Sequence, residues 1–451
     1  MRFPAALAAF LAVSACGGSE TTPASDRNES AAEASISGDR YVATDATTPQ
    51  INSIAEDFVK LSLGLGQYDK AFVDAYHGPS AWADEAAANP PSLSALATEA
   101  AGLLISLQNL NAVEPTPRSV MLERLVRAAD TRIKMAAGET FSFDEETRLL
   151  YDAVAPQYAL AAFDEALEKI DALLPGDAPL NERVDAFRNG LAIPEDKLQV
   201  VFDRAIDECK TRTLQHYTLP DTERFSLEFV KDKPWSGYNW YQGDFDSLIQ
   251  VNTDFPIVID RAIDLGCHEG YPGHHTWNVI LERDILNSEG WVEYSLYPLF
   301  SPLSLIAEGT ANYGIDLAFP GGEKITFERD VLFPLAGLDP DKAGTLAALN
   351  EAMRALSHAR NHIAREYLDG RIDREEAINL VMRYRLESRA RAEQTLDFIE
   401  TYRGYVINYN LGLDLVDAYI EREVADGGEP WAVFEKLLRA PPSASDLSAS
   451  K

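Results

Sequence analysis

One segment constrains the fold of this chain more than any other: the nonapeptide CHEGYPGHH at residues 267–275. It holds three of the seven histidines of the protein, with a glutamate directly after the first. Clustered imidazoles beside a carboxylate are typical of a catalytic zinc site, in which histidine nitrogens bind the metal and an unligated glutamate accepts a proton from water. We therefore take Glu269 as the candidate general base. The alternative is a structural histidine cluster.

If two of these histidines bind one metal ion, their spacing excludes a regular helix through the segment. His268 and His274 are six residues apart, which on a straight helix separates them by about 120° around the axis. Pro272 cannot donate a backbone hydrogen bond, and its ring clashes with the carbonyl of the residue four before it. Without Pro272 and Gly273, His268 and His274 would have the i, i+4 spacing of an HExxH zinc helix. We therefore predict a two-residue bulge with His268 and His274 as metal ligands, and His275 as the alternative to His274.

Helical periodicity dominates the chain from residue 51 to about residue 440. Apolar residues recur at 3.6-residue spacing, as in Ile54, Phe58 and Leu61. No internal repeat and no linker rich in proline or glycine divides this stretch. We expect a single mostly helical domain over residues 51–440, followed by a frayed tail at 441–451.

A single region breaks the helical pattern. Residues 224–253 hold three short runs of β-branched and aromatic residues, separated by turn residues. They predict a small antiparallel β-meander. A helix should begin near Pro256, since proline is tolerated in the first turn, and should carry the histidines. The core of the metal site would then span residues 256–317.

The N-terminal residues, MRFPAALAAFLAVSAC, indicate an exported protein. One positive charge precedes an apolar stretch that is too short to span a bilayer. The ending Val-Ser-Ala-Cys resembles a bacterial lipobox, which predicts removal of residues 1–15 and lipidation of Cys16. Residues 16–50 are rich in small, polar and acidic residues, typical of a flexible tether. We expect a cell-envelope protein held in membrane lipid through acylated Cys16, on the periplasmic face of the outer membrane if the host is Gram-negative.

Composition narrows the possible partners. The chain has 40 basic and 72 acidic residues, a net charge of −32, so it repels phosphate backbones and we expect no nucleic-acid partner. Its 46% hydrophobic content excludes a disordered protein. Besides Cys16 it has only Cys209 and Cys267. A bridge between these two is possible in an oxidising compartment, but we expect two buried thiols.

The histidine segment closely resembles the HEAxPGHH signature of the bacterial family called domain of unknown function 885, a set of predicted zincin-like metallopeptidases. Members of that family carry a Gly-Glu-Gly-type segment on a later helix, and Ala307-Glu308-Gly309 fits that place, forty residues after His268. The resemblance implies Glu308 as the third metal ligand, with Asn312 one turn later orienting a ligand. It further implies a mostly α, gluzincin-like fold around a deep cleft, one Zn²⁺ per chain, and hydrolysis of peptides by zinc-activated water.

A second stretch of the resemblance lies near the C-terminus, where family members carry P-G-Q-x3-Y-x2-G. Gly404, Tyr409 and Gly412 match this pattern, whereas Arg403 and Tyr405 replace its proline and glutamine. We predict that Tyr409 donates a hydrogen bond to the oxyanion of the reaction, with packing in the core as the alternative. Arg403 could do the same or bind a substrate carboxylate, with a surface ion pair as the alternative.

The remaining histidine pair is His358 and His362, which have metal-ligand spacing on a helix. Several arginines surround them, so we expect packing or substrate contact rather than a second metal site. The interpretation we favour is a lipid-anchored zinc metallopeptidase that cleaves short peptides. The alternatives are a metal- or ligand-binding lipoprotein without turnover, and a zinc hydrolase of a non-peptide amide. Glu269 favours an enzyme, because a general base is not needed merely to hold a metal.

Overall fold

The computed structural model describes residues 48–448 except residue 234. The predicted signal segment, the lipidation site Cys16 and the tether up to residue 47 lie outside the described residues. The described residues belong to one compact unit. No helix within the described part of the chain is both long and apolar enough to cross a membrane.

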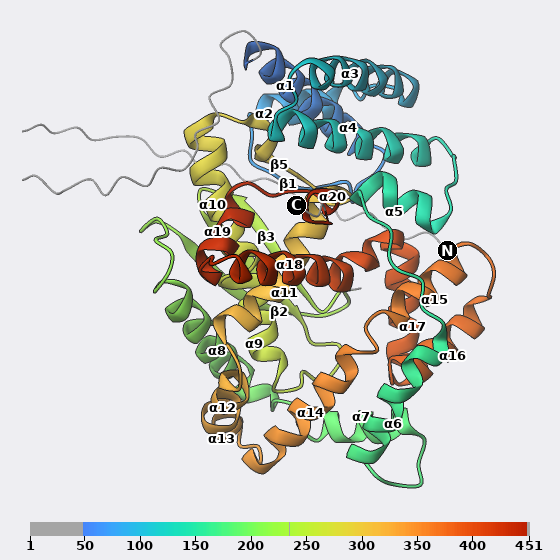
Figure 1. Ribbon diagram of the computed structural model, residues 1–451, viewed down its shortest axis with the longest axis vertical. Coiled ribbons are helices and arrows are strands. Elements are labelled where there is room, and N and C mark those ends of the chain that lie inside the picture. Colours follow the sequence, from blue (N-terminus) through green and yellow to red (C-terminus); the bar gives the residue numbers. More distant parts are fainter. Residues whose placement is uncertain (1–47, 234, 449–451) are drawn as a thin grey trace, which may run out of the picture. The chain divides into compact units, whose positions relative to one another are not determined.

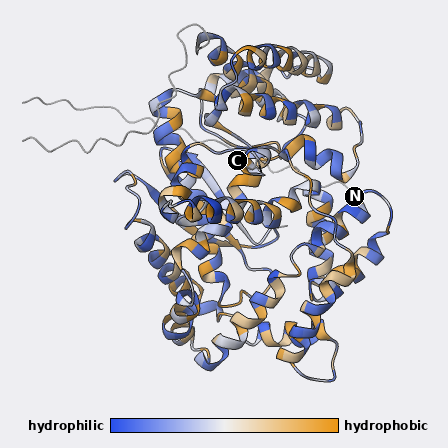
Figure 2. Ribbon diagram, viewed as in Figure 1, coloured by the Kyte–Doolittle hydropathy of each residue, from blue (hydrophilic) through white to orange (hydrophobic). Residues whose placement is uncertain are grey.

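Helices dominate the described residues, so the predicted mostly helical class is confirmed (Figure 1). Polar and apolar residues share most of the helices (Figure 2), as expected where one face packs on a core. The helices that precede the central sheet are α1 (Thr48–Leu65), α2 (Ser80–Ala88), α3 (Leu93–Val113), α4 (Pro117–Ala136), α5 (Phe143–Tyr151), α6 (Asp164–Leu173), α7 (Leu180–Asn189) and α8 (Leu198–Thr213).

The helices after the sheet begin with the segment that carries the histidines. They are α9 (Arg261–Leu265), α10 (His274–Ile280), α11 (Pro302–Ala318), α12 (Glu323–Phe327), α13 (Phe333–Ala336), α14 (Ala343–Arg354), α15 (Ala359–Leu368), α16 (Arg374–Tyr384), α17 (Arg389–Tyr402), α18 (Ile407–Ala425), α19 (Pro430–Arg439) and α20 (Ala444–Ser448). The last of these corrects the expected frayed tail. Ala444 and Leu447 are buried, and Asp446 forms an ion pair with Arg124 on α4.

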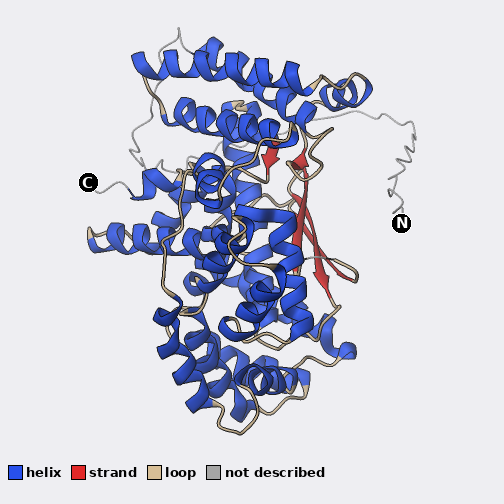
Figure 3. Cartoon of the chain, turned by 90° about the vertical axis from the view of Figure 1, so that its right-hand side faces the viewer, coloured by secondary structure: helices blue, strands red, loops and turns tan. Residues whose placement is uncertain are grey.

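The three strands of the main sheet lie where the sequence predicts them, along one side of the helical body (Figure 3). The main sheet contains β2 (Arg224–Val230), β3 (Gly237–Gly243) and β4 (Asp246–Asn252) in the order β2-β4-β3. A second, two-stranded antiparallel sheet pairs β1 (Val73–Tyr76) with β5 (Leu296–Pro298).

The pairing within the main sheet corrects the predicted antiparallel meander. β3 pairs antiparallel with β4, but β2 pairs parallel with β4. The reason is burial: β4 alternates buried residues, with Ile249 and Val251 in the core, and it takes the central position. This order makes β3 an edge strand of the sheet.

The helix that carries the histidines is broken at the predicted place. α9 continues into a wider π-helical turn over Gly266–Gly270, and α10 begins only at His274. The Gly273 N–H donates to the carbonyl of Cys267 at 3.0 Å. A Cβ atom on Gly273 would lie 1.9 Å from the carbonyl oxygen of His268. Only glycine can therefore stand at this position, where the chain folds back on the π-helical turn.

Two long helices cross at the centre of the structure, α11 and α18 (Figure 1). A Cβ on Gly309 of α11 would lie 2.4 Å from the carbonyl oxygen of Gly412, and a Cβ on Gly412 would lie 2.5 Å from that of Leu305. The two glycines let the backbones of the helices touch. This contact brings the helix that carries Glu308 directly against the helix that carries Tyr409.

Cys209 and Cys267 form a disulfide, which corrects the expectation of two buried thiols. Their Cα atoms are 5.4 Å apart and both residues are fully buried. The bond links α8 to the π-helical turn immediately before His268. Sequence spacing could not decide this, because the contact between α8 and that turn depends on the tertiary fold.

Candidate metal centre

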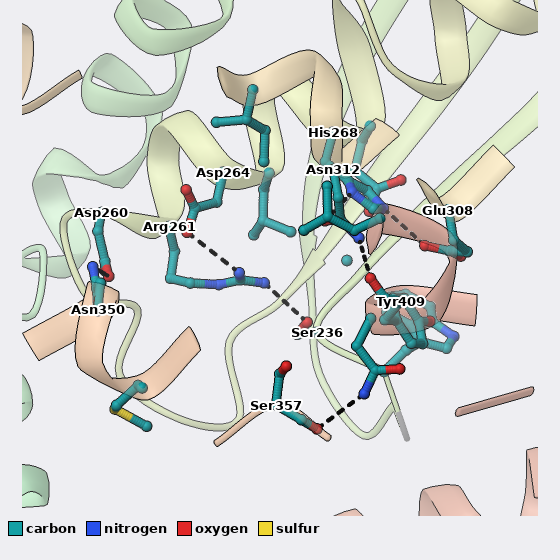
Figure 4. A pocket seen from close by; sticks show the side chains of 18 of the residues that line it. Ser236, Asp260, Arg261, Asp264, His268, Glu308, Asn312, Asn350, Ser357 and Tyr409 are labelled. Carbon is teal, nitrogen blue, oxygen red and sulfur yellow. Dashed lines mark hydrogen bonds and ion pairs between the residues drawn. The ribbon is translucent and has the colours of Figure 1, made fainter. Parts of the chain in front are cut away.

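A cavity of about 1180 Å³ lies between the main sheet, the histidine segment and the helices of the second half of the chain. Its wall includes His268, Glu269 and His274, together with Glu308 from α11 and Tyr409 from α18. Figure 4 shows His268, Glu308 and Asn312 grouped on one side of this cavity, with Tyr409 beside them. The structure thus brings together five of the residues that the sequence singles out.

Two imidazoles and one carboxylate converge on a common point. The Nε2 atoms of His268 and His274 are 3.1 Å apart. Oε2 of Glu308 lies 3.2 Å from Nε2 of His268 and 3.9 Å from Nε2 of His274. Ligands that hold zinc tetrahedrally at 2.0–2.1 Å are separated from one another by ~3.3 Å. The spacing of the three atoms fits that requirement.

The two oxygens of the Glu308 carboxylate differ in their hydrogen bonding. Oε1 accepts a hydrogen bond from the Tyr405 hydroxyl at 2.7 Å. Oε2 is buried and has no hydrogen-bond partner among the described residues. A buried carboxylate oxygen without a partner carries a large desolvation cost. A cation at the point shared with the two histidines would remove that cost, so the residues fit a bound metal.

A hydrogen-bond chain sets the tautomer of His268. The Asn312 side-chain amide donates through Nδ2 to the backbone oxygen of Tyr409 at 3.1 Å, so its Oδ1 faces His268. That oxygen lies 3.1 Å from Nδ1 of His268 and therefore requires a proton on Nδ1. The lone pair of Nε2 then points at Glu308 and His274. This is the arrangement in which a ligand histidine donates through its other nitrogen.

Burial governs the electrostatics of the cluster. Burial lowers the pKa of His274 to about 4, which keeps that imidazole neutral and able to bind a metal. Burial also raises the pKa of Glu269 to about 7, and the nearby Glu308 carboxylate adds to the rise. Asp74 on β1 lies close enough for the charges of Glu269 and Glu308 to act on its carboxyl group. Its pKa is raised to about 7, chiefly by burial and then by Glu308 and Glu269.

Glu269 stands beside the three convergent atoms and keeps its carboxylate available. Its Oε1 lies 4.0 Å from Nε2 of His268, and the reactive atoms of His268, Glu269 and His274 lie within 4.8 Å of one another. No side chain in the described residues donates a hydrogen bond to this carboxylate. Its backbone is fixed, because Asn239 on β3 donates to the Glu269 carbonyl at 2.7 Å. The position suits a proton acceptor next to a metal.

The alternative ligand His275 is not part of this cluster. Its Nδ1 lies 2.8 Å from the Ser247 hydroxyl and its Nε2 lies 2.8 Å from Oε2 of Glu223. Tyr271 donates to the same carboxylate oxygen at 2.7 Å. Although burial opposes it, hydrogen bonds from His275, Lys210 and Tyr271 hold the pKa of Glu223 down at about 2. His275 and Ser247 are fully buried, so this network ties the sheet to α10 rather than facing the cavity.

Arg403 does not reach the cavity, and its predicted roles need correction. Its Nε donates to Oε2 of Glu146 at 2.7 Å, and Glu146 is buried on α5. The Gly404 N–H donates to the other oxygen of the same carboxylate at 3.0 Å. A guanidinium held this way by a buried partner anchors α5 to the turn before α18. The pair is more buried than the surface ion pair that the sequence suggested as the alternative.

The second histidine pair also remains apart from any metal cluster. Nε2 of His358 lies 2.8 Å from a carboxylate oxygen of Asp414 on α18. In the described residues, His362 joins no group of three potential metal ligands.

Sequence reasoning missed the role of Tyr405. It noted this residue only as a departure from the family pattern, whereas the structure shows its hydroxyl holding Glu308. Asp74 on β1 likewise lines the cavity and accepts a hydrogen bond from Tyr238. No local spacing rule could have joined either residue to His268, because the contacts cross more than 90 residues of sequence.

No family model matches the chain, and no curated protein matches it in sequence. Among solved structures, it resembles a predicted lipoprotein from Colwellia psychrerythraea, with a TM-score of 0.51 and 14% identity over 81% of this chain and 71% of that one. It also resembles Trypanosoma cruzi metallocarboxypeptidase 1, with a TM-score of 0.44 and 14% identity over 89% and 91%. The first likeness shows a shared fold and nothing more. The second is too weak to support a conclusion about this chain.

Proposed function

We propose that this protein is a zinc-dependent peptidase that hydrolyses short peptides, with His268, His274 and Glu308 as the metal ligands. One observation carries the proposal. Two imidazole nitrogens and the partnerless oxygen of Glu308 converge within 3.9 Å, inside a cavity large enough for a peptide. Two histidines and a glutamate are a recurring ligand set of catalytic zinc, and they leave a position open for reaction.

In the proposed mechanism Glu269 acts as the general base. When bound, zinc supplies Lewis acidity, which polarises an amide carbonyl and acidifies water. The Glu269 carboxylate accepts a proton from the attacking water and passes it to the leaving amine. Burial brings its pKa to about 7, close to the value at which a group can both take up and release a proton near neutral pH.

Two further features of the cavity suit a peptide. Tyr409 lines the wall beside the cluster, and burial raises its pKa well above the ordinary value, so its hydroxyl stays protonated and can donate to an oxyanion. β3, an edge strand of the main sheet, also lines the cavity, with Gly237 and Asn239 on its wall. An edge strand can pair with the backbone of an extended peptide.

The proposal includes a location. The Val-Ser-Ala-Cys ending supports cleavage before Cys16 and a lipid anchor in the cell envelope. The Colwellia protein that shares the fold is itself described as a predicted lipoprotein. A lipid-anchored peptidase would act on peptides outside the cytoplasm.

The test is a metal analysis followed by a peptide digest. We expect one zinc per purified chain, and cleavage of members of a short-peptide library that stops on addition of a chelator and returns with zinc. Zinc without cleavage of any amide would replace the proposal with a metal-binding lipoprotein. Cleavage restricted to non-peptide amides would retain the zinc hydrolase and exclude the peptidase.

A further inference from the structure

One cationic side chain in the cavity stands out because it forms no ion pair with any described residue. Six arginines line the cavity wall, and five of them lie within 4.0 Å of an aspartate or glutamate oxygen: Arg188, Arg261, Arg354, Arg385 and Arg391. Arg360 is the sixth. Among the described residues it has no ion-pair partner, although the chain carries a large excess of acidic groups.

The Arg360 guanidinium makes few hydrogen bonds with its surroundings. Nε is buried and has no hydrogen-bond partner among the described residues, and Nη2 donates only a long bond of 3.3 Å to the carbonyl of Val406. The nearby carboxylate Glu387 is already engaged by Arg385 at 2.8 Å and by the Thr395 hydroxyl at 2.7 Å. Burial lowers the pKa of Arg360 to about 10, so the group remains charged at neutral pH.

Arg360 is connected to the metal centre through two tyrosines. Its guanidinium lies 4.9 Å from the centre of the Tyr409 ring. That ring is 5.7 Å from the ring of Tyr405, whose hydroxyl holds Glu308. The cavity therefore has acidic groups at the metal centre and, on the Tyr409 ring, a cation that pairs with no carboxylate in the described part of the chain.

A buried guanidinium without a partner is costly, and a carboxylate that pairs with it through two parallel hydrogen bonds offsets the cost. We propose that Arg360 binds a carboxylate of the substrate, so that the cavity selects peptides with a negative charge next to the cleaved bond. This inference rests on the proposed peptidase function and names its substrate class. Such a carboxylate could be the free C-terminus of a peptide or the side chain of an acidic residue.

Three blocked peptides of one neutral sequence separate these sources. The first ends in a free carboxylate, the second in a carboxamide, and the third is the carboxamide with glutamate as its last residue. We expect the zinc-loaded full chain to cleave the first or the third with a kcat/KM at least about 10-fold above that of the second, through a lower KM. The favoured peptide identifies the source. Equal rates on all three would overturn the proposal while leaving the peptidase intact.

Substitutions then assign the preference to one side chain. Arg360→Gln should bring the ratio of kcat/KM between the favoured peptide and the neutral carboxamide down to about one. Arg360→Lys should restore part of the preference. Arg354→Gln is the matched control, because Arg354 lines the same cavity but is exposed and already pairs with Asp316. Full preference retained in Arg360→Gln would overturn the assignment.

Binding measured without turnover separates this proposal from the function it rests on. In a Glu269→Gln background, the favoured peptide should bind at least about 10-fold more tightly than the neutral carboxamide, and Arg360→Gln should remove the difference. If no peptide is ever cleaved but this difference in Kd is present, the carboxylate site stands and the peptidase does not. If Arg360→Gln fails to fold, the comparison of the three peptides still tests the carboxylate preference, and Arg360→Lys tests the assignment, since an undiminished preference in that variant would overturn it.

Discussion

The Tyr405 hydroxyl donates a 2.7 Å hydrogen bond to Oε1 of Glu308 and thereby assigns the two oxygens of that carboxylate different roles. Oε1 is occupied, so only Oε2 faces the Nε2 atoms of His268 and His274. The bond therefore favours coordination through a single oxygen. It also fixes the rotation of a ligand that comes from a different helix than the two histidines.

Removing this hydroxyl should loosen the metal. In Tyr405→Phe, Oε1 of Glu308 loses its donor and the carboxylate can turn away from the histidines. We expect zinc affinity to fall ~10–100-fold, as is typical when a residue that supports a ligand is lost. Competition with a chromogenic chelator measures it. Tyr402→Phe is the control, since Tyr402 lines the same cavity and its ring packs against Tyr405. Equal zinc affinities in the two variants would contradict this role.

Two adjacent histidines should behave oppositely. His274→Ala removes a proposed ligand, so the zinc content of the purified protein should fall sharply. His275→Ala should keep the zinc but lower the melting temperature, because it leaves Glu223 and Ser247 without their buried partner. Metal analysis and thermal unfolding of both variants check the pair. The reverse pattern would make His275 the ligand.

Glu269→Gln should separate binding from chemistry. The amide keeps the size of the side chain but cannot accept a proton, so zinc content and peptide affinity should persist while kcat falls ~10²–10⁴-fold. Glu351→Gln, at an exposed glutamate on the same cavity, should leave kcat unchanged. Near-normal turnover by Glu269→Gln would remove the proposed base. Loss of zinc would instead identify Glu269 as a ligand.

A pair of glycine substitutions tests the helix crossing beneath the site. Gly309→Ala would place a Cβ 2.4 Å from the backbone oxygen of Gly412, so α11 and α18 must separate. We expect a loss of about 1–3 kcal/mol in the free energy of unfolding. Gly344→Ala, on α14, meets nothing within 4 Å and should stabilise by up to about 1 kcal/mol. Denaturant unfolding measures both, and equal effects would refute the close contact.

The lipid anchor is tested by Cys16→Ser. Without the thiol the precursor should be neither acylated nor processed by the lipoprotein signal peptidase. Fractionation of cells and the mass of the mature N-terminus provide the measurement. A serine variant that is processed normally and stays with the membrane would show that Cys16 is not the anchor.

Local patterns account for the parts of the structure that sequence reasoning predicted. Helical periodicity, the turn residues around 224–253 and the proline in the histidine segment all act over a few residues. They predict the mostly helical domain, the three strands and the break before His274 correctly, whereas the helix expected to begin near Pro256 begins only at Arg261. Strand pairing depended on which strand is most buried, so the parallel contact of β2 with β4 could not be derived from alternation alone.

The partners of the site residues could not be derived from local patterns either. Arg403 has the charge of a substrate-binding residue, but only the tertiary fold shows that Glu146, 257 residues earlier, neutralises it. Arg360 has the same charge, but it forms no ion pair with an acidic residue in the described chain. The difference between the two arginines is one of packing, and neither neighbouring sequence reveals it.

The disulfide between Cys209 and Cys267 closes a covalent loop of chain that forms part of the cavity wall. The 58-residue span that it closes contains all three strands of the main sheet and α9, and it ends one residue before His268. Closing a loop of that length removes about 4 kcal/mol of chain entropy from the unfolded protein. A chain produced in a reducing compartment would lack this disulfide. The oxidation state of the two cysteines should therefore be measured together with the metal content whenever the activities of two preparations are compared.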